Sequence, residues 1–122
     1  MKGLEIVKLD LKRENEQGPI YEFENSNNSA LILVKKKKGC VFAGKYHRGD
    51  YPSRFPKVIV FLDGSFEACF KNVDSGEELK KTYSKPVMFK VMPKVFHEFK
   101  ALSDCTLLDM NPWGYYDDAE NL

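Results

Sequence analysis

Residues 58–70 read VIVFLDGSFEACF, two short apolar runs separated by Asp63-Gly64. The runs are rich in β-branched and aromatic residues, and each has the length of a strand rather than of a helix. An Asp-Gly pair between two such runs is the strongest short hairpin signal, because a type I′ turn needs positive φ angles at both central residues. The stretch therefore predicts two strands joined by a tight turn.

Runs of the same kind recur along the chain, at residues 4–9, 30–34, 41–46, 87–92, 95–101 and 106–110. A polar cluster at Asn72–Gly76 predicts another turn. No segment shows a helical period over twelve residues. Eight or more strands at roughly ten-residue spacing favour a sandwich or a barrel. We predict an all-β, single-domain jelly-roll β-barrel that comprises residues 1–122.

The composition narrows the possible partners. Nineteen Lys plus Arg nearly balance eighteen Asp plus Glu, so the chain lacks the basic surface that nucleic-acid binding by bulk charge requires. No apolar run approaches the ~20 residues that span a bilayer, and the N-terminus has no signal-peptide core. The three cysteines are widely spaced and indicate reduced, mostly buried thiols. We expect a cytoplasmic protein with no nucleic-acid or membrane partner.

The only two histidines lie in the segments Gly44-Lys45-Tyr46-His47 and Pro93-Lys94-Val95-Phe96-His97. A strand period of two puts Lys45 and His47 on one face. A small barrel could bring His47 and His97 to one cavity although they are fifty positions apart in the sequence. Two imidazoles there could bind a metal, move protons or form hydrogen bonds in a core.

These segments resemble the two cupin motifs. The first cupin motif has a glycine before a His-x-His pair, then a Glu, then six residues and a glycine. Here Lys45, His47 and Lys57 stand at the two His positions and the Glu position, and Gly64 closes the motif. Met92–His97 is similar to the second motif. The resemblance implies a cupin-type jelly roll. Because two ammonium groups replace ligands of the metal cupins, we expect no metal and no cofactor.

Both segments further resemble the metal-free group of RmlC-like cupins that contains dTDP-4-keto-6-deoxyhexose 3,5-epimerases and 3,4-ketoisomerases. In those families a histidine in the barrel lumen moves a proton on the carbon next to a ketone, and basic side chains hold the diphosphate. The resemblance implies an isomerase or epimerase that acts on a nucleotide-linked 4-keto-6-deoxy sugar in surface polysaccharide biosynthesis. It also implies a homodimer.

On this reading His47 is the candidate base, and His97 either donates a proton or orients the substrate. Lys45 or Lys57 could stabilise an enolate, or both could bind the diphosphate together with Arg54. Two aromatic residues are candidates for flanking a base or sugar, Phe61 and Phe99.

Two other functions remain open from the sequence. The barrel could be a catalytically silent module that binds a sugar or a small ligand, because the first His of the His-x-His pair is Lys45. It could also be a metal-dependent cupin enzyme whose two imidazoles hold a metal. At the C-terminus, the acidic and aromatic stretch Trp113–Asp118 is expected to pack on the barrel or on a neighbouring subunit.

Overall fold

The computed structural model describes residues 1–24, 31–110 and 118–122. Within these ranges the chain is built from strands and a single 3-10 turn. Along the chain these are β1 (Leu4–Lys8), β2 (Asp10–Asn15), β3 (Gly18–Glu22), β4 (Ile32–Lys36), β5 (Val41–His47), η1 (Pro52–Arg54), β6 (Lys57–Asp63), β7 (Phe66–Asn72), β8 (Glu78–Tyr83), β9 (Val87–Val91), β10 (Val95–Ala101), β11 (Cys105–Asp109) and β12 (Ala119–Glu120). The predicted all-β class is confirmed. No helix among the described residues has the length and apolar character that a membrane crossing requires.

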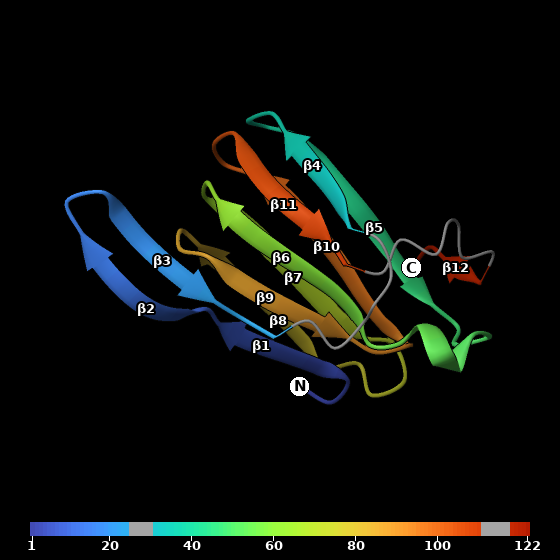
Figure 1. The fold of residues 1–122 in the computed structure, drawn as a ribbon. Helices are drawn as coiled ribbons and strands as arrows, with labels where there is room; N and C mark the ends of the chain where they lie inside the picture. The colour runs from blue at the N-terminus through green and yellow to red at the C-terminus, as the bar shows by residue number, and fades with distance from the viewer. Residues whose placement is uncertain (25–30, 111–117) are drawn as a thin grey trace.

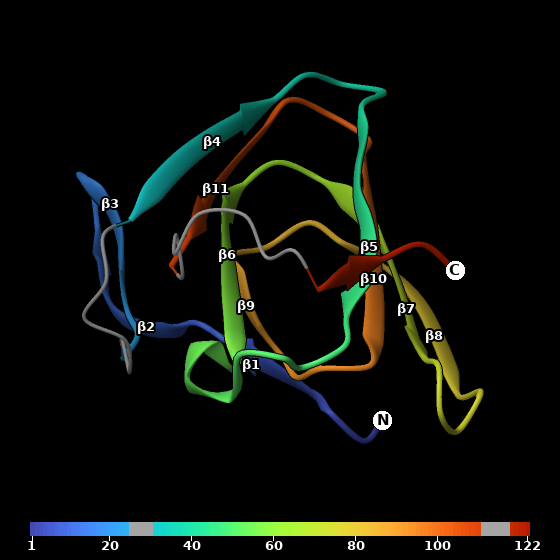
Figure 2. The same cartoon turned by 90° about the vertical axis from the view of Figure 1, so that its right-hand side faces the viewer.

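Two antiparallel five-stranded sheets face each other (Figures 1 and 2). The β6 sheet has the order β1-β9-β6-β11-β4, and the β10 sheet has the order β12-β5-β10-β7-β8. From β5 to β7 and again from β8 to β11, the chain crosses between the sheets at every connection, which is the winding of a jelly roll. The two large sheets are separate rather than closed into one barrel, and β2 and β3 form a third, two-stranded sheet.

The Asp63-Gly64 turn joins β6 to β7, but these strands lie in different sheets, so the predicted hairpin is wrong. Gly64 does adopt a positive φ of 89°, and a Cβ atom there would lie 2.4 Å from a backbone oxygen. The rings of Phe61 and Phe66 stack across the interior with centroids 3.7 Å apart. Each strand therefore turns its own apolar face to the core from opposite sides, and this burial determines the sheet to which each belongs.

The Asn72–Gly76 turn is confirmed and joins β7 to β8 as a true hairpin. The Asn72 side-chain oxygen accepts hydrogen bonds from the backbone N–H groups of Asp74 and Ser75, at 3.0 and 3.1 Å. This is the local contact that makes asparagine a frequent turn residue.

The core fills the space between the sheets with aromatic side chains. Phe61, Phe66, Phe89 and Phe99 are at most 1% exposed and contact one another. Burying one such ring contributes roughly 1.5–3 kcal/mol to stability. Of the cysteines, Cys105 is buried, whereas the other two are half-buried, so the expectation of mostly buried thiols is met only in part. All three thiols are free.

Candidate active site

An irregularity in β5 turns His47 toward the interior. Phe42 of β5 faces the core, and strict alternation along the strand would put Gly44 next on that face. The register between β5 and β10 shifts instead, and Gly44 becomes an extra residue with a φ of 68°. After this bulge, Lys45 lies opposite His97, and His47 follows on the same face. The predicted common face of Lys45 and His47 is thereby confirmed.

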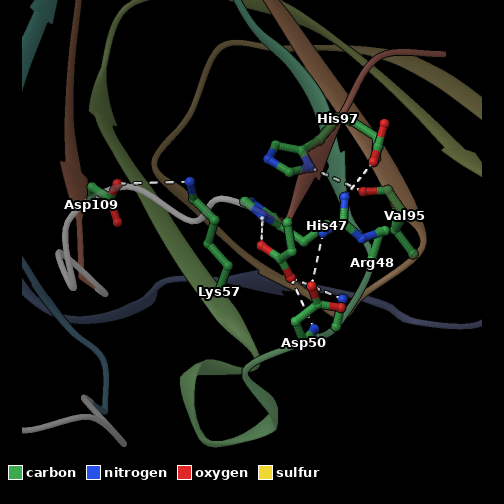
Figure 3. Close-up of polar contacts among 10 residues, drawn as sticks. His47, Arg48, Asp50, Lys57, Val95, His97 and Asp109 are labelled. Carbon is green, nitrogen blue, oxygen red and sulfur yellow. Dashed lines mark hydrogen bonds and ion pairs between the residues drawn. The ribbon is translucent and has the colours of Figure 1, made fainter.

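The structure brings the two imidazoles together, as the sequence predicted. Their ring centroids are 6.2 Å apart, and both residues are buried, His47 at 7% and His97 at 2% exposure. They project from the neighbouring strands β5 and β10 (Figure 3). Lys57 and Asp109, from β6 and β11 of the opposite sheet, lie on the other side of the same site (Figure 3).

Asp118 is the site residue that the sequence reasoning missed. Its side chain is fully buried, and its carboxylate lies 3.1 Å from Nδ1 of His47. It also accepts hydrogen bonds from the backbone N–H groups of Gly49 and Asp50, at 2.9 and 3.1 Å. Burial raises the pKa of Asp118, but the bonds from Gly49, His47 and Asp50 outweigh it and hold that pKa below its usual value. Asp118 is therefore an anion against the imidazole.

The chain end that carries Asp118 is fastened to β5. Strand β12 pairs with the end of β5, and the guanidinium of Arg48 forms an ion pair with Glu120. Arg48 also pairs with Asp50 at 2.8 Å, and the Lys45 ammonium donates to the Asn121 side-chain oxygen at 2.7 Å. These contacts position the Asp118 carboxylate. The rest of the predicted C-terminal packing, residues 113–117, lies outside the described residues.

His97 is held as a neutral ring in one tautomer. Its Nδ1 lies 3.1 Å from the carbonyl oxygen of Val95, which can only accept, so Nδ1 carries the proton. Complete burial, with the positive charge of Lys57 adding to it, lowers the pKa of His97 to about 3. The other ring nitrogen, Nε2, therefore keeps its lone pair and can accept a hydrogen bond.

His47 is also neutral at pH 7, but it is poised to take a proton. Burial lowers its pKa, the hydrogen bond to Asp118 raises it in part, and the charge of Lys57 lowers it again. Because an ionised carboxylate only accepts, Nδ1 of His47 carries the proton and Nε2 is basic. The arrangement of imidazole and buried carboxylate is that of a general base with an orienting anion.

Lys57 brings positive charge to the site without being fully exposed. Its side chain is 20% exposed, and its ammonium lies 3.9 Å from the carboxylate of Asp109. The positive charge of this ammonium lowers the pKa of both imidazoles, so Lys57 acts electrostatically on the site.

Four other predicted residues are placed differently. Phe61 and Phe99 are 1% exposed and belong to the packed core. Lys45 shares the face of His47, but its side chain is exposed and its ammonium donates to the Asn121 side chain. Arg54 is half-buried with its guanidinium over the Tyr51 ring, 4.5 Å from the centroid.

The donor set does not have the composition of a metal centre. Within residues 1–24, 31–110 and 118–122, no three or more His, Cys, Asp and Glu side chains are grouped so that they could hold a metal ion. Two imidazoles also fall short of the three protein ligands that a catalytic zinc site normally supplies.

No protein-family model matches the chain, and no curated protein does. Solved structures, in contrast, are clearly similar. The 3,4-ketoisomerase QdtA from Thermoanaerobacterium thermosaccharolyticum, a double mutant in complex with TDP, superposes with a TM-score of 0.77 at 18% identity, over 100% of this chain and 89% of that one. The dTDP-4-dehydrorhamnose 3,5-epimerase from Sulfolobus tokodaii has a TM-score of 0.73 at 16% identity, over 100% and 78%. ChmJ, a 3'-monoepimerase from Streptomyces bikiniensis in complex with dTDP, has a TM-score of 0.81 at 13% identity, over 99% and 69%.

Identities this low establish the fold and leave the reaction to be argued from the site. The chain therefore shares its fold with dTDP-sugar 3,4-ketoisomerases and 3,5-epimerases.

Proposed function

We propose that this protein is a metal-free isomerase or epimerase that acts on a nucleotide-linked 4-keto-6-deoxy sugar by proton transfer through His47. The observation that carries the proposal is the buried pair of His47 and Asp118, with Nδ1 of the imidazole 3.1 Å from the carboxylate. The similar structures solved with TDP and dTDP support a nucleotide sugar as the substrate class.

The reaction begins at the carbon next to the ketone. Nε2 of His47 takes the proton from this carbon, and the electrons of the C–H bond form an enolate on the ketone oxygen. Asp118 stabilises the imidazolium that results, without itself taking the proton. Return of the proton to the same carbon on its opposite face completes an epimerisation. For a ketone shift, the hydroxyl on that carbon also gives up its proton and becomes the new ketone, the former ketone oxygen gains a proton and becomes a hydroxyl, and the former carbonyl carbon receives the proton from His47.

Two neighbouring groups assist this step. The Lys57 ammonium, which already lowers the pKa of both imidazoles, supplies positive charge for the developing enolate oxygen. Nε2 of His97 accepts a hydrogen bond from a sugar hydroxyl and orients the ring. Arg54 is the proposed contact of the diphosphate, because it adjoins Phe55, whose ring lies 5.7 Å from that of His47.

Deuterium exchange tests the proposal directly. Purified protein is incubated with dTDP-4-keto-6-deoxyglucose in deuterated water, and ring protons are followed by NMR. Loss of a proton signal next to the ketone is expected with the native chain and not with His47→Asn. Absence of exchange under conditions where the nucleotide sugar binds would refute the enzymatic proposal.

That same result would favour the silent binding module, for which the use of Lys45 as a contact to Asn121 is the supporting observation. Metal analysis of protein purified without chelator checks the remaining alternative. A stoichiometric metal content, lost in His97→Asn, would establish a metal-dependent cupin instead.

A further inference from the structure

A cavity lies at β1 and β8, which are edge strands of the two facing sheets. Its volume is about 350 Å³, and β1, the end of β8 and the turn that leads to Val87 line it; we call it the β1–β8 cavity. Val87 is the register partner of Phe61, whereas Lys57 pairs with Val91 at the other end of β9. Four residues along a strand correspond to about 13 Å, so the β1–β8 cavity is separate from the His47 site.

Two lysines occupy core-facing positions on these edge strands. Along β1, Leu4 packs on the core, and the strand period of two puts Lys8 on the same face. Along β8, Leu79 and Tyr83 pack on the core, and Lys81 lies between them on that face. Apolar residues normally take such positions. Because both lysines are exposed, a solute can reach their ammonium groups.

The polar lining of the β1–β8 cavity is positively charged. Lys85, from the turn after β8, adds a third ammonium group to those of Lys8 and Lys81. Thr82 and Ser84, whose hydroxyls can donate hydrogen bonds, also line the cavity. Among the described residues, no carboxylate lines it, and none of the three lysines forms an ion pair. Such a concentration of one charge attracts anions.

Carboxylates lie nearby without neutralising this charge. Lys8 and Lys85 also border a second cavity, which is lined in part by Asp10 and Glu14. Asp10 pairs with Lys12 instead, at 2.9 Å. Within the described part of the chain, neither carboxylate lies within ion-pair distance of Lys8 or Lys85. The ammonium groups of the β1–β8 cavity can therefore bind an anion from solution.

The β1–β8 cavity also has an apolar lining. Ile6 contributes to it and is 39% exposed, although it shares the core-facing side of β1 with Lys8. Tyr83 stacks on Phe66 with ring centroids 5.4 Å apart, and the Lys81 ammonium lies 5.4 Å from the Tyr83 centroid. The Tyr83 hydroxyl is buried and has no hydrogen-bond partner among the described residues. Buried hydroxyls nearly always have a partner, and an anion or a water held in the cavity would supply one.

We propose that the β1–β8 cavity binds a small phosphorylated molecule. The phosphoryl group lies among the ammonium groups of Lys8, Lys81 and Lys85, and the organic part lies against the apolar lining. A phosphoryl group fits better than a carboxylate, because it carries up to two negative charges and three acceptor oxygens. This inference does not rest on the proposed enzymatic function, which uses the opposite end of β9.

Amide NMR spectra of the isotope-labelled native chain locate the binding. Inorganic phosphate and phenyl phosphate are the probes. Both are expected to shift the signals of residues 6–8 and 81–87, with saturation below about 10 mM. Phenyl phosphate is expected to bind about tenfold more tightly, because its ring buries apolar surface. The same shifts are expected in His47→Asn, and their loss there would assign the binding to the His47 site and overturn the inference.

Lys81→Met tests the contact, and Lys80→Met is its matched control. Lys80 is the preceding residue of β8, lies on the opposite face, and pairs with Glu67. Lys81→Met is expected to weaken phosphate binding by about tenfold, and Lys80→Met by less than about twofold. Circular dichroism verifies that both variants are folded.

Two further results would overturn the inference. Equal weakening by Lys81→Met and Lys80→Met would mean that phosphate responds to overall charge and not to the cavity. Absence of saturable shifts at residues 6–8 and 81–87 of the native chain would leave Lys8 and Lys81 another role, since inward-pointing charges also keep edge strands from pairing with other chains.

Discussion

The neutral state of His97 makes stability depend on pH in a defined direction. The unfolded chain protonates this imidazole near pH 6.5, whereas the folded protein resists protonation down to a pKa of about 3. The unfolded state therefore binds more protons over this range, and acid favours it. The contribution of His97 to stability is complete above pH 6.5 and is lost as the pH falls toward 3. Between pH 7 and pH 5 the loss amounts to about 2 kcal/mol.

The measurement compares urea unfolding of the native chain and of His97→Asn at several pH values, followed by far-UV circular dichroism. The amide nitrogen of the variant can still donate to the carbonyl oxygen of Val95, but it does not titrate. We expect the native free energy of unfolding to fall more steeply between pH 7 and pH 5 than that of the variant, by about 1 kcal/mol per pH unit. If the free energy of unfolding changes with pH in the same way for the native chain and for His97→Asn, burial does not hold the His97 ring neutral.

Other perturbations address the rest of the site and the fold. Asp118→Asn removes the charge that supports a His47 imidazolium, so deuterium exchange is expected to slow by about 100-fold or more, and an unchanged rate would exclude this role. Lys57→Met removes a charge that lowers the pKa of both His47 and His97, so both values are expected to rise in an NMR titration; static values would contradict the placement of Lys57. Gly64→Ala puts a Cβ atom 2.4 Å from a backbone oxygen at a φ of 89°, and about 1–3 kcal/mol of unfolding free energy is expected to be lost, as read from urea unfolding. A variant as stable as the native chain would mean that the turn relaxes freely.

The sequence predicts the strands that have an apolar face, but it does not predict the strands that are held mainly by backbone pairing. The runs that became β6, β7, β9 and β10 carry the core residues, so their composition predicts them. The hairpin strands β2 and β3 are exposed along almost their whole length, and β8 is largely polar. Such strands owe their existence to partners that local composition does not encode.

The Asp63-Gly64 turn shows a related limit. The dipeptide correctly predicted a positive φ at Gly64, because that is a property of the local backbone. Whether the two flanking strands pair with each other depends on tertiary structure. Here both strands bury their apolar faces in the core, and this burial places them in different sheets. Stacking of Phe61 on Phe66 across the core is the contact that separates the strands into opposite sheets.

The candidate site divides in the same way. The approach of His47 and His97 followed from motif spacing, whereas Asp118 could not be located, because its contact to His47 spans 71 positions and depends on a two-residue strand. Phe61 and Phe99 were predicted as ligand contacts because they are aromatic, but both are buried in the core. Residue type alone does not tell a core ring from a binding ring.

Lys45 links the departure from the cupin motif to the support of His47. It occupies the position at which the cupin motif carries its first histidine, and an ammonium group there cannot serve as a metal ligand while it is protonated. In this chain its exposed ammonium donates to the side-chain oxygen of Asn121, three residues beyond Asp118. Together with the pair of Arg48 and Glu120, this contact fastens the strand that brings the buried carboxylate to His47. The departure from the metal-binding motif thus coincides with a different support for the remaining histidine, in which a hydrogen-bonded anion takes the orienting role.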